Sequence, residues 1–345
     1  MKRVFERYTV AFLFAMAITS CRKDRPESPL DVPNAPVQHG VYVINEGNFQ
    51  WANASVSHFD PATGAVVEDL YQPANGEALG DVLQSMTLHG GKAYLVVNNS
   101  GKVVVVDPNT FETTGTITGF VSPRHFLPVS ASKGYVSDLQ SGNISVVDLG
   151  ANTITATIRC PGWTEAMIHA GGQVFVTNQS RRYVYVIDTS TDALVDSIPV
   201  SRGGNSMVQD ANGRIWLACT GGGGTVPAIH RIHPETRTVE VTFALATGVD
   251  SPWRLVINAE GTVIYYLNNG VYRMDITMDV LPTTPFISGE GRNFYGVGVD
   301  PATSEVYVAD ALDYTQRGLV LRFTSTGDAR GNFHAGRIPS GFVFR

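Results

Sequence analysis

Short runs of alternating apolar and polar residues dominate the chain from about residue 40 onward. In the segment CPGWTEAMIHAGGQVFVTNQSRRYVYVIDTSTDALVDSIPV (160–200), three such runs, QVFVTN, YVYVID and LVDSIPV, are each closed by Asn, Asp, Gly or Pro. A period of two predicts half-buried strands, and the closing residues predict tight turns between them. The segment therefore predicts three strands of an antiparallel meander.

This pattern recurs with a nearly constant period. One strand of each unit ends in Asp or His, at intervals of 40 to 47 residues: Asp60, Asp107, Asp148, Asp188, His233 and Asp275. A degenerate unit, LVLRF (319–323), lies one period later. A period of this size with several strands per unit is typical of a β-propeller.

The two ends of the chain predict how the ring closes. A fourth strand precedes the triplet in every unit except the first (40–70). The C-terminal segment GRIPSGFVF (336–344) has the form of the missing strand. We therefore predict an all-β, seven-bladed propeller of four-stranded antiparallel blades over residues 40–345, in which the C-terminal strand completes the first blade and removes exposed sheet edges.

The composition limits the possible functions. Of the 345 residues, 43% are hydrophobic and 16% are charged, which supports a large core and excludes a disordered chain. The formal net charge is −6 at pH 7. Because nucleic-acid binding needs a basic surface, we exclude that class.

The first residues predict export and lipid attachment. Residues 1–20 read as a signal peptide, because basic residues precede an apolar run (9–20) that is too short to cross a bilayer. ITSC (18–21) resembles a bacterial lipobox, which makes Cys21 the candidate lipid anchor. Residues 21–39, rich in proline and charge, predict a flexible tether. We therefore expect an exported protein that is held to a membrane by lipid.

The other two cysteines, Cys160 and Cys219, leave two alternatives open. A disulfide is possible in an exported chain, and two small buried apolar side chains explain them equally well.

Two sets of motifs resemble known propellers. VFVTN (174–178) and AYLVVNN (93–99) resemble the repeat of YVTN-type, YncE-like propellers. VINEGNF (43–49), LGDVLQSM (79–86) and CPGWTEAM (160–167) resemble surface lipoproteins of the Bacteroides group. That resemblance implies an outer-membrane protein that faces the cell exterior and touches the membrane through its lipid only. It also implies capture of cobalamin or a ferric siderophore beside a TonB-dependent outer-membrane transporter.

One face of the predicted propeller carries the candidate site. The loops that lead into the innermost strands, and those that join the second and third strands, crowd this face around the central channel. They are rich in arginine and aromatic residues, which suit a large aromatic or anionic ligand. The candidate ligand-binding residues are Phe49, Trp51, Arg124, His125, Trp163, Glu165, Arg181, Arg182, Arg202, Trp253, Arg254, Arg292, Tyr295 and Tyr314.

A structural role is the alternative for each of these residues. Trp163 and Trp253 would then pack in the core between blades. Arg124 or Arg254 would pair with an acidic residue of the next blade.

Other motifs give weaker signals. TGGGGT (220–225) is followed by no helical pattern, which favours a flexible loop over a phosphate-binding loop. His230 and His233 point to opposite faces of a strand, which argues against a shared metal. Asn45 with Glu46, and Asp310 with Asp313, could bind calcium or simply form turns. We expect no metal or cofactor.

Three functions fit this sequence. We favour a binding lipoprotein that captures a scarce metal chelate for a TonB-dependent transporter. The alternatives are an adhesive or structural surface propeller, and an enzyme of the lactonase, lyase or quinoprotein type. No nucleophile–base pair stands out, so we expect no enzyme. Between the chelates, an anionic aromatic ferric siderophore matches arginine and tryptophan slightly better than the bulky, amide-rich and nearly neutral cobalamin.

Overall fold

The computed structural model describes residues 40–345. The predicted signal peptide, the Cys21 anchor and the tether lie outside these residues, and they stay predictions. Within the described range the chain forms 28 strands and one short helix, α1 (Tyr71–Asn75). In that range, no helix has the length and apolar character needed to cross a membrane.

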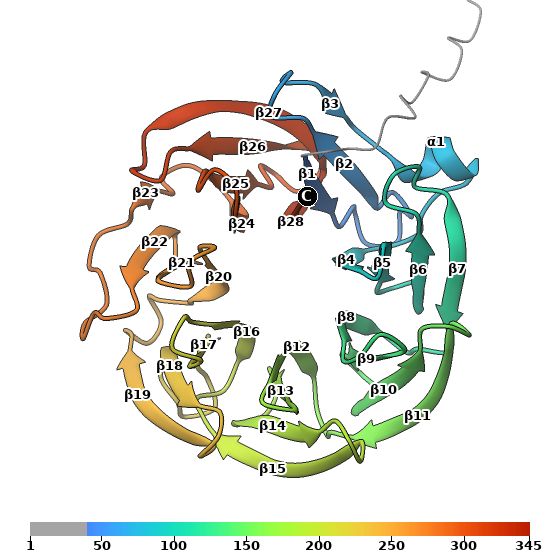
Figure 1. Ribbon diagram of the computed structural model, residues 1–345. Coiled ribbons are helices and arrows are strands. Elements are labelled where there is room, and N and C mark those ends of the chain that lie inside the picture. Colours follow the sequence, from blue (N-terminus) through green and yellow to red (C-terminus); the bar gives the residue numbers. More distant parts are fainter. Residues whose placement is uncertain (1–39) are drawn as a thin grey trace, which may run out of the picture. The chain divides into compact units, whose positions relative to one another are not determined.

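The strands form seven four-stranded antiparallel sheets, arranged as blades around a central channel (Figure 1). From the innermost strand outward, blade 1 consists of β28 (Pro339–Phe344), β1 (Val41–Asn45), β2 (Ser55–Phe59) and β3 (Val66–Val67), and blade 2 consists of β4 (Leu83–His89), β5 (Lys92–Val97), β6 (Lys102–Val106) and β7 (Thr113–Thr118). In the same order, blade 3 consists of β8 (Pro123–Pro128), β9 (Lys133–Asp138), β10 (Asn143–Asp148) and β11 (Thr153–Arg159), and blade 4 consists of β12 (Thr164–Ala170), β13 (Gln173–Asn178), β14 (Tyr183–Asp188) and β15 (Ala193–Pro199). Blade 5 consists of β16 (Gly204–Gln209), β17 (Ile215–Cys219), β18 (Ala228–His233) and β19 (Thr238–Ala244). Blade 6 consists of β20 (Trp253–Ile257), β21 (Val263–Leu267), β22 (Gly270–Asp275) and β23 (Ile287–Ser288). Blade 7 consists of β24 (Phe294–Val299), β25 (Val306–Asp310), β26 (Arg317–Phe323) and β27 (Ala329–Arg337). The predicted fold class is confirmed.

The C-terminal strand closes the ring, as predicted. β28 is the innermost strand of blade 1 and pairs antiparallel with β1, with Val41 opposite Phe344. The main chains of Gly40 and Arg345 exchange two hydrogen bonds of 3.0 Å beside this pairing. β24 of blade 7 packs closely against β28, since a Cβ atom at Gly296 would lie only 2.6 Å from the Ser340 carbonyl.

The core is divided among the spaces between blades. Seven clusters of buried apolar side chains each join strands of neighbouring blades. Cys160 and Cys219 lie in two different clusters, and both are free thiols. The structure therefore supports the second alternative for the cysteines, because each packs as a small apolar residue, and burial raises the pKa of the Cys160 thiol to about 12.

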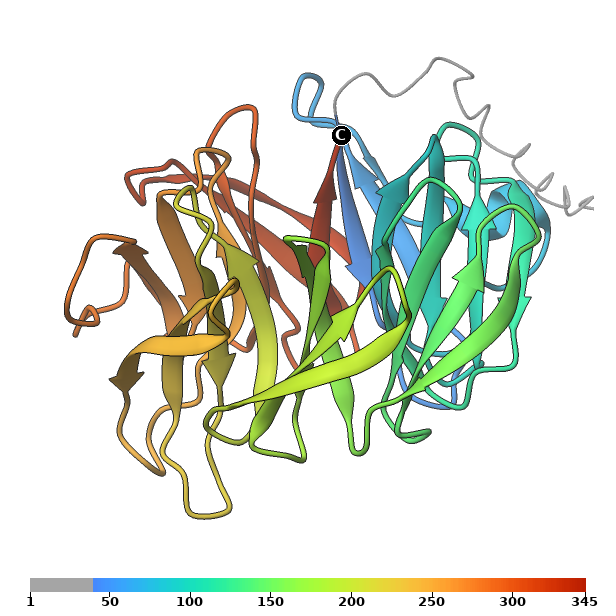
Figure 2. The same cartoon turned by 60° about the horizontal axis from the view of Figure 1, so that its bottom comes forward.

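The recurrent aspartate of the sequence has a structural role in the turns. Asp60, Asp188 and Asp275 each accept a hydrogen bond of 2.8 Å from the backbone N–H two residues later. This Asx turn starts the connection from the third strand to the outer strand. Figure 2 shows that the strands run between two faces of the ring, with loops at both. These turns lie at the face opposite the candidate site.

Candidate ligand-binding site

A β-bulge recurs in the innermost strand of every blade. Near the end where this strand begins, its register with the second strand shifts, so that one or two residues of the inner strand stand outside the ladder. A bulge re-aims side chains, and here it directs them to the channel. The first bulge residues of blades 1 to 7 are Ser340, Gln84, Arg124, Glu165, Asn205, Arg254 and Tyr295.

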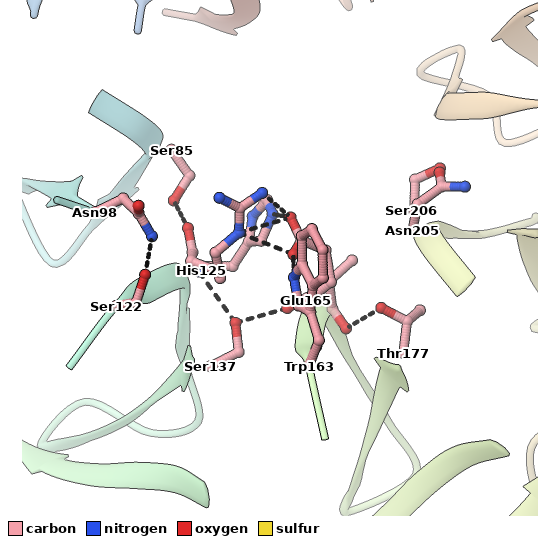
Figure 3. Close-up of polar contacts among 12 residues, drawn as sticks. Ser85, Asn98, Ser122, His125, Ser137, Trp163, Glu165, Thr177, Asn205 and Ser206 are labelled. Atoms are coloured by element: carbon pink, nitrogen blue, oxygen red, sulfur yellow. Dashed lines mark hydrogen bonds and ion pairs between the residues drawn. The ribbon is translucent and has the colours of Figure 1, made fainter. Parts of the chain in front are cut away.

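Hydroxyl groups stabilise the bulges from the side. The bulged carbonyls of Arg124 and Glu165 accept hydrogen bonds from Ser85 (2.8 Å) and Ser137 (2.6 Å), both on the preceding blade (Figure 3). Within blade 4, Thr177 donates to the Ala166 carbonyl at 3.3 Å. Because a bulge removes ladder partners from backbone groups, these hydroxyls supply the missing bonds and fix the bulges in place.

The bulge residues surround a cavity of about 400 Å³ at this end of the channel. Six of the seven line it, and residues from the surrounding loops complete the wall. The volume falls within the usual range of small-molecule sites. The lining residues are Glu46, Val82, Gln84, Arg124, Trp163, Glu165, Gln179, Asn205, Thr220, Ser251, Trp253, Arg254, Asn268, Asn269 and Tyr295.

One wall of the cavity is a bidentate ion pair between blades 3 and 4. Both Glu165 oxygens accept hydrogen bonds from Arg124, at 2.8 to 3.1 Å. The Trp163 indole N–H also donates to Glu165, and His125 Nε2 lies 3.4 Å from its Oε1 (Figure 3). The Arg124 guanidinium lies 5.6 Å from the centre of the Trp163 ring. Four groups thus hold one another rigidly.

The carboxylate of Glu165 stays ionised in this setting. Burial by itself raises the pKa of Glu165, but the charge of Arg124 and the hydrogen bonds from His125 and Arg124 outweigh it and lower the pKa to about 2. Glu165 is therefore a very weak base at neutral pH.

The opposite wall joins blades 1, 6 and 7. Glu46 follows β1, and its carboxylate lies 3.3 Å from Arg254 Nη2 and accepts a 3.2 Å hydrogen bond from the Tyr295 hydroxyl. The Arg254 guanidinium lies over Trp253 (5.2 Å) and Tyr295 (5.7 Å). The Trp253 and Tyr295 rings meet edge to face at 5.2 Å, an arrangement that aromatic pairs favour.

Two features of this wall depart from an ordinary ion pair. Burial raises the pKa of Glu46, and the charges of Arg254 and Arg124 oppose the increase only in part. Arg254 has a φ of +55°, a conformation that non-glycine residues rarely adopt. Its Nε is buried and has no hydrogen-bond acceptor among residues 40–345. Strain and an unpaired donor at one residue are typical of functional positions.

The structure divides the fourteen predicted residues. Six line the cavity: Arg124, Trp163, Glu165, Trp253, Arg254 and Tyr295. Two touch this group from outside it, because His125 approaches Glu165 and the Tyr314 ring lies 5.7 Å from that of Tyr295. Both arginines of the cavity are paired with glutamate. Both tryptophans are half-buried in its wall, and Trp253 also packs against the apolar cluster between blades 6 and 7.

The other six predicted residues lie outside the cavity. Phe49 and Trp51, in the β1–β2 loop, are 62% and 74% exposed. Arg292 pairs with Asp310 at 3.1 Å, and Asp313 caps a turn, so turn and ion-pair roles account for these aspartates. The remaining three are exposed arginines of neighbouring loops: Arg181, Arg182 and Arg202.

Several cavity residues were not among the predicted binding residues. Gln84 occupies the bulge of blade 2, and its signal was its place two residues into the inner strand, the same place as Arg124 and Glu165. Glu46 could have been recognised in the sequence, because it is a charged residue directly after a predicted buried strand. Gln179 and Thr220 gave no signal, because polar residues in loops are common.

Comparison with known proteins identifies the family. A family model described as a domain of unknown function, DUF5074, matches residues 39–329. The chain belongs to this family. No curated protein matches the chain. Membership in the DUF5074 family states no activity, and the narrower resemblance to YVTN-type capture lipoproteins stays a prediction.

Solved structures of the same fold come from several bacteria. A quinonprotein alcohol dehydrogenase-like protein of Bacteroides thetaiotaomicron has a TM-score of 0.70 and 16% identity, with 88% of this chain and 78% of that one covered. The periplasmic gluconolactonase PpgL of Pseudomonas aeruginosa gives 0.66 and 14%, covering 89% and 98%. A functionally unknown protein of Desulfotomaculum acetoxidans gives 0.67 and 12%, covering 89% and 98%. Identities this low show the fold alone.

Proposed function

We propose that this DUF5074 protein is a lipid-anchored binding protein of the outer membrane whose cavity holds an uncharged ligand rich in hydrogen-bonding groups. One observation carries the proposal. The four charged side chains of the cavity are paired with each other, whereas the uncharged side chains of Gln84, Gln179 and Thr220 have no hydrogen-bond partner within the described residues.

The pairing of charges changes the preference between ligands. An anionic ligand gains little from Arg124 or Arg254, because each is already neutralised by a glutamate. Free amides and a hydroxyl offer donors and acceptors to a neutral, amide-rich molecule, and the tryptophan and tyrosine rings offer it apolar surface. Of the two metal chelates suggested by the sequence, cobalamin therefore fits better than a ferric catecholate. Since cobalamin is bulky, only one side of it would enter a cavity of about 400 Å³.

The state of Glu165 supports a structural role for this carboxylate in the wall of a binding cavity. A general base needs a pKa near the working pH. Glu165 has a pKa of about 2 and all its strong contacts are to donors of the protein, which suits a rigid wall. We therefore keep enzyme activity outside the proposal.

Calorimetry of the purified chain tests the ligand class. We expect cobalamin to bind more tightly than a ferric catecholate, with weak dependence on salt. Gln84→Leu and Gln179→Leu should each raise the Kd several-fold, since a hydrogen bond between neutral groups contributes about 0.5–1.5 kcal/mol. Gln316→Leu is the matched control, because Gln316 is an exposed glutamine of the β25–β26 loop on the same face. Tighter catecholate binding, or equal affinities for all variants, would refute the ligand assignment.

The anchor and the transporter form the second part of the proposal. We expect Cys21→Ala to release the protein from the membrane fraction, because this variant lacks the residue that carries the lipid, and the lipid is the only membrane attachment that we propose. Purified wild-type lipoprotein should co-purify with a TonB-dependent transporter encoded in its neighbourhood. Unchanged membrane association of the Cys21→Ala variant would contradict the anchor, and it would leave the cavity assignment unaffected.

A further inference from the structure

Three arginines beside the cavity differ from the other arginines of the described chain. The side chains of Arg181, Arg182 and Arg202 make no ion pair or hydrogen bond with any residue in 40–345. All three are exposed or partly exposed and lie in the loops before β14 and β16. Unpaired cations held close together repel one another, so an anion between them would be stabilised.

The glycine-rich loop 220–225 lies against two of these arginines as an ordered turn. Gly222 and Thr225 exchange backbone hydrogen bonds of 2.9 and 3.1 Å. The Arg202 N–H donates to Thr225 Oγ1 at 3.0 Å, and the Arg202 carbonyl accepts from Gly221 at 2.9 Å. The loop that the sequence predicts to be flexible is therefore an ordered turn, which is hydrogen-bonded to both the N–H and the carbonyl group of Arg202.

The glycines leave room for the guanidinium groups. A Cβ atom at Gly223 would lie 3.0 Å from Arg202 Nη1, and one at Gly224 would lie 3.6 Å from Arg182 Nη2. Both glycines have positive φ, at 58° and 84°. Their N–H groups have no acceptor among the described residues. Two guanidinium groups thus lie beside consecutive residues of a turn, and the N–H groups of those residues have no acceptor within 40–345.

We infer that Arg182, Arg202 and the N–H groups of Gly223 and Gly224 form a binding site for a tetrahedral oxyanion, such as a phosphate or sulfate group. A guanidinium donates two parallel hydrogen bonds to such a group, and successive backbone N–H groups in a turn form an anion-binding concavity. The loop of Arg182 also contributes Gln179 to the cavity wall, and the loop of the two glycines contributes Thr220. The site therefore lies beside the cavity mouth, and it would take a phosphate or sulfate group independently of the uncharged ligand in the cavity. The inference does not rest on the neutral-ligand proposal, because it concerns different side chains.

A calorimetric titration of the purified chain with inorganic phosphate tests the site. We expect saturable binding that weakens as sodium chloride is added, because exposed charges are screened. Arg182→Gln and Arg202→Gln should each raise the Kd about tenfold, since each removes charged hydrogen bonds. Gly224→Ala tests the turn itself, because it should weaken phosphate binding while both arginines remain. Gln84→Leu should bind phosphate as the wild type does, which separates this site from the cavity.

The matched control is Arg330→Gln, which removes an exposed cation on β27 of blade 7. Equal melting temperatures would show that all variants are folded. Glucose 6-phosphate and vesicles containing phosphatidic acid distinguish a soluble phosphate ester from a lipid headgroup, and binding of either that depends on Arg182 and Arg202 supports the site. Failure to bind phosphate, or binding that Arg330→Gln weakens as much as Arg202→Gln, would overturn the inference.

Discussion

Removal of residues 339–345 is expected to abolish cooperative unfolding of the propeller. These residues form β28, which pairs with β1 along the channel, and its Phe342 and Phe344 rings pack against Tyr307 of blade 7. Because Phe342 and Phe344 are partly buried, loss of each side chain costs up to about 3 kcal/mol, and the open ring also exposes strand edges. The sum is comparable with the whole stability of a typical domain, about 5–15 kcal/mol.

Differential scanning calorimetry measures this effect. The control lacks Arg345 only, which follows β28. Its loss removes the hydrogen bonds of Arg345 with Gly40, Pro108 and Asn109 but leaves the strand and its two phenylalanines in place. We expect one sharp transition for the control and a broad or absent transition for the longer truncation. A truncated protein that melts sharply within a few degrees of the wild type would show that the ring does not need its closing strand.

Substitution of Glu165 by alanine is expected to cost about 3–5 kcal/mol of stability, although the residue lies in the cavity wall rather than in the apolar core. The reason is that the Arg124 side chain is only 14% exposed and would become a buried charge without a partner. Glu68→Ala is the matched control, because Glu68 forms an exposed pair with Arg317, and such pairs contribute at most about 1 kcal/mol. Denaturant unfolding of both variants gives the comparison, and equal losses would contradict the structural role of Glu165.

Glu165 also makes the free energy of unfolding depend on pH in the acid range. The pKa of Glu165 is lowered from 4.5 to about 2 in the folded protein, so the unfolded chain binds the proton more readily between these values. The stabilisation is therefore complete above pH 4.5 and is lost as the pH falls toward 2, with a total of about 3 kcal/mol. Glu165→Gln should flatten this part of the stability curve. A curve for the variant that falls as steeply as that of the wild type would exclude Glu165 as the cause.

The fold could be predicted from the sequence because each blade repeats one pattern. Even the closing strand was predicted, since GRIPSGFVF supplied the strand that the first unit lacked. The channel residues Arg124, Glu165, Arg254 and Tyr295 were also found, because they occupy equivalent places in successive repeats. A repeat fixes where a side chain stands along its strand.

A repeat does not fix which side chains meet across the channel. Glu46 and Arg254 are 208 residues apart in sequence, and they come together only because the ring brings blade 6 to face the end of β1. The neutralisation of both cavity arginines follows from such contacts, and it could not be predicted from composition. The same holds for the exposure of Trp51, because a loop sequence does not indicate whether its aromatic residue turns inward or outward.

The pairing of the two terminal strands also determines how the site is presented. β1 runs from Gly40, where the main chain meets Arg345, to the end at which Glu46 lines the cavity. Whatever precedes residue 40 therefore joins the propeller at the face away from the cavity. With a lipid on Cys21, the tether would leave from that face, so the attachment itself would not cover the cavity. Residues 21–39 could separate the two by at most about 65 Å, so the protein would search a shallow layer above the membrane for its ligand.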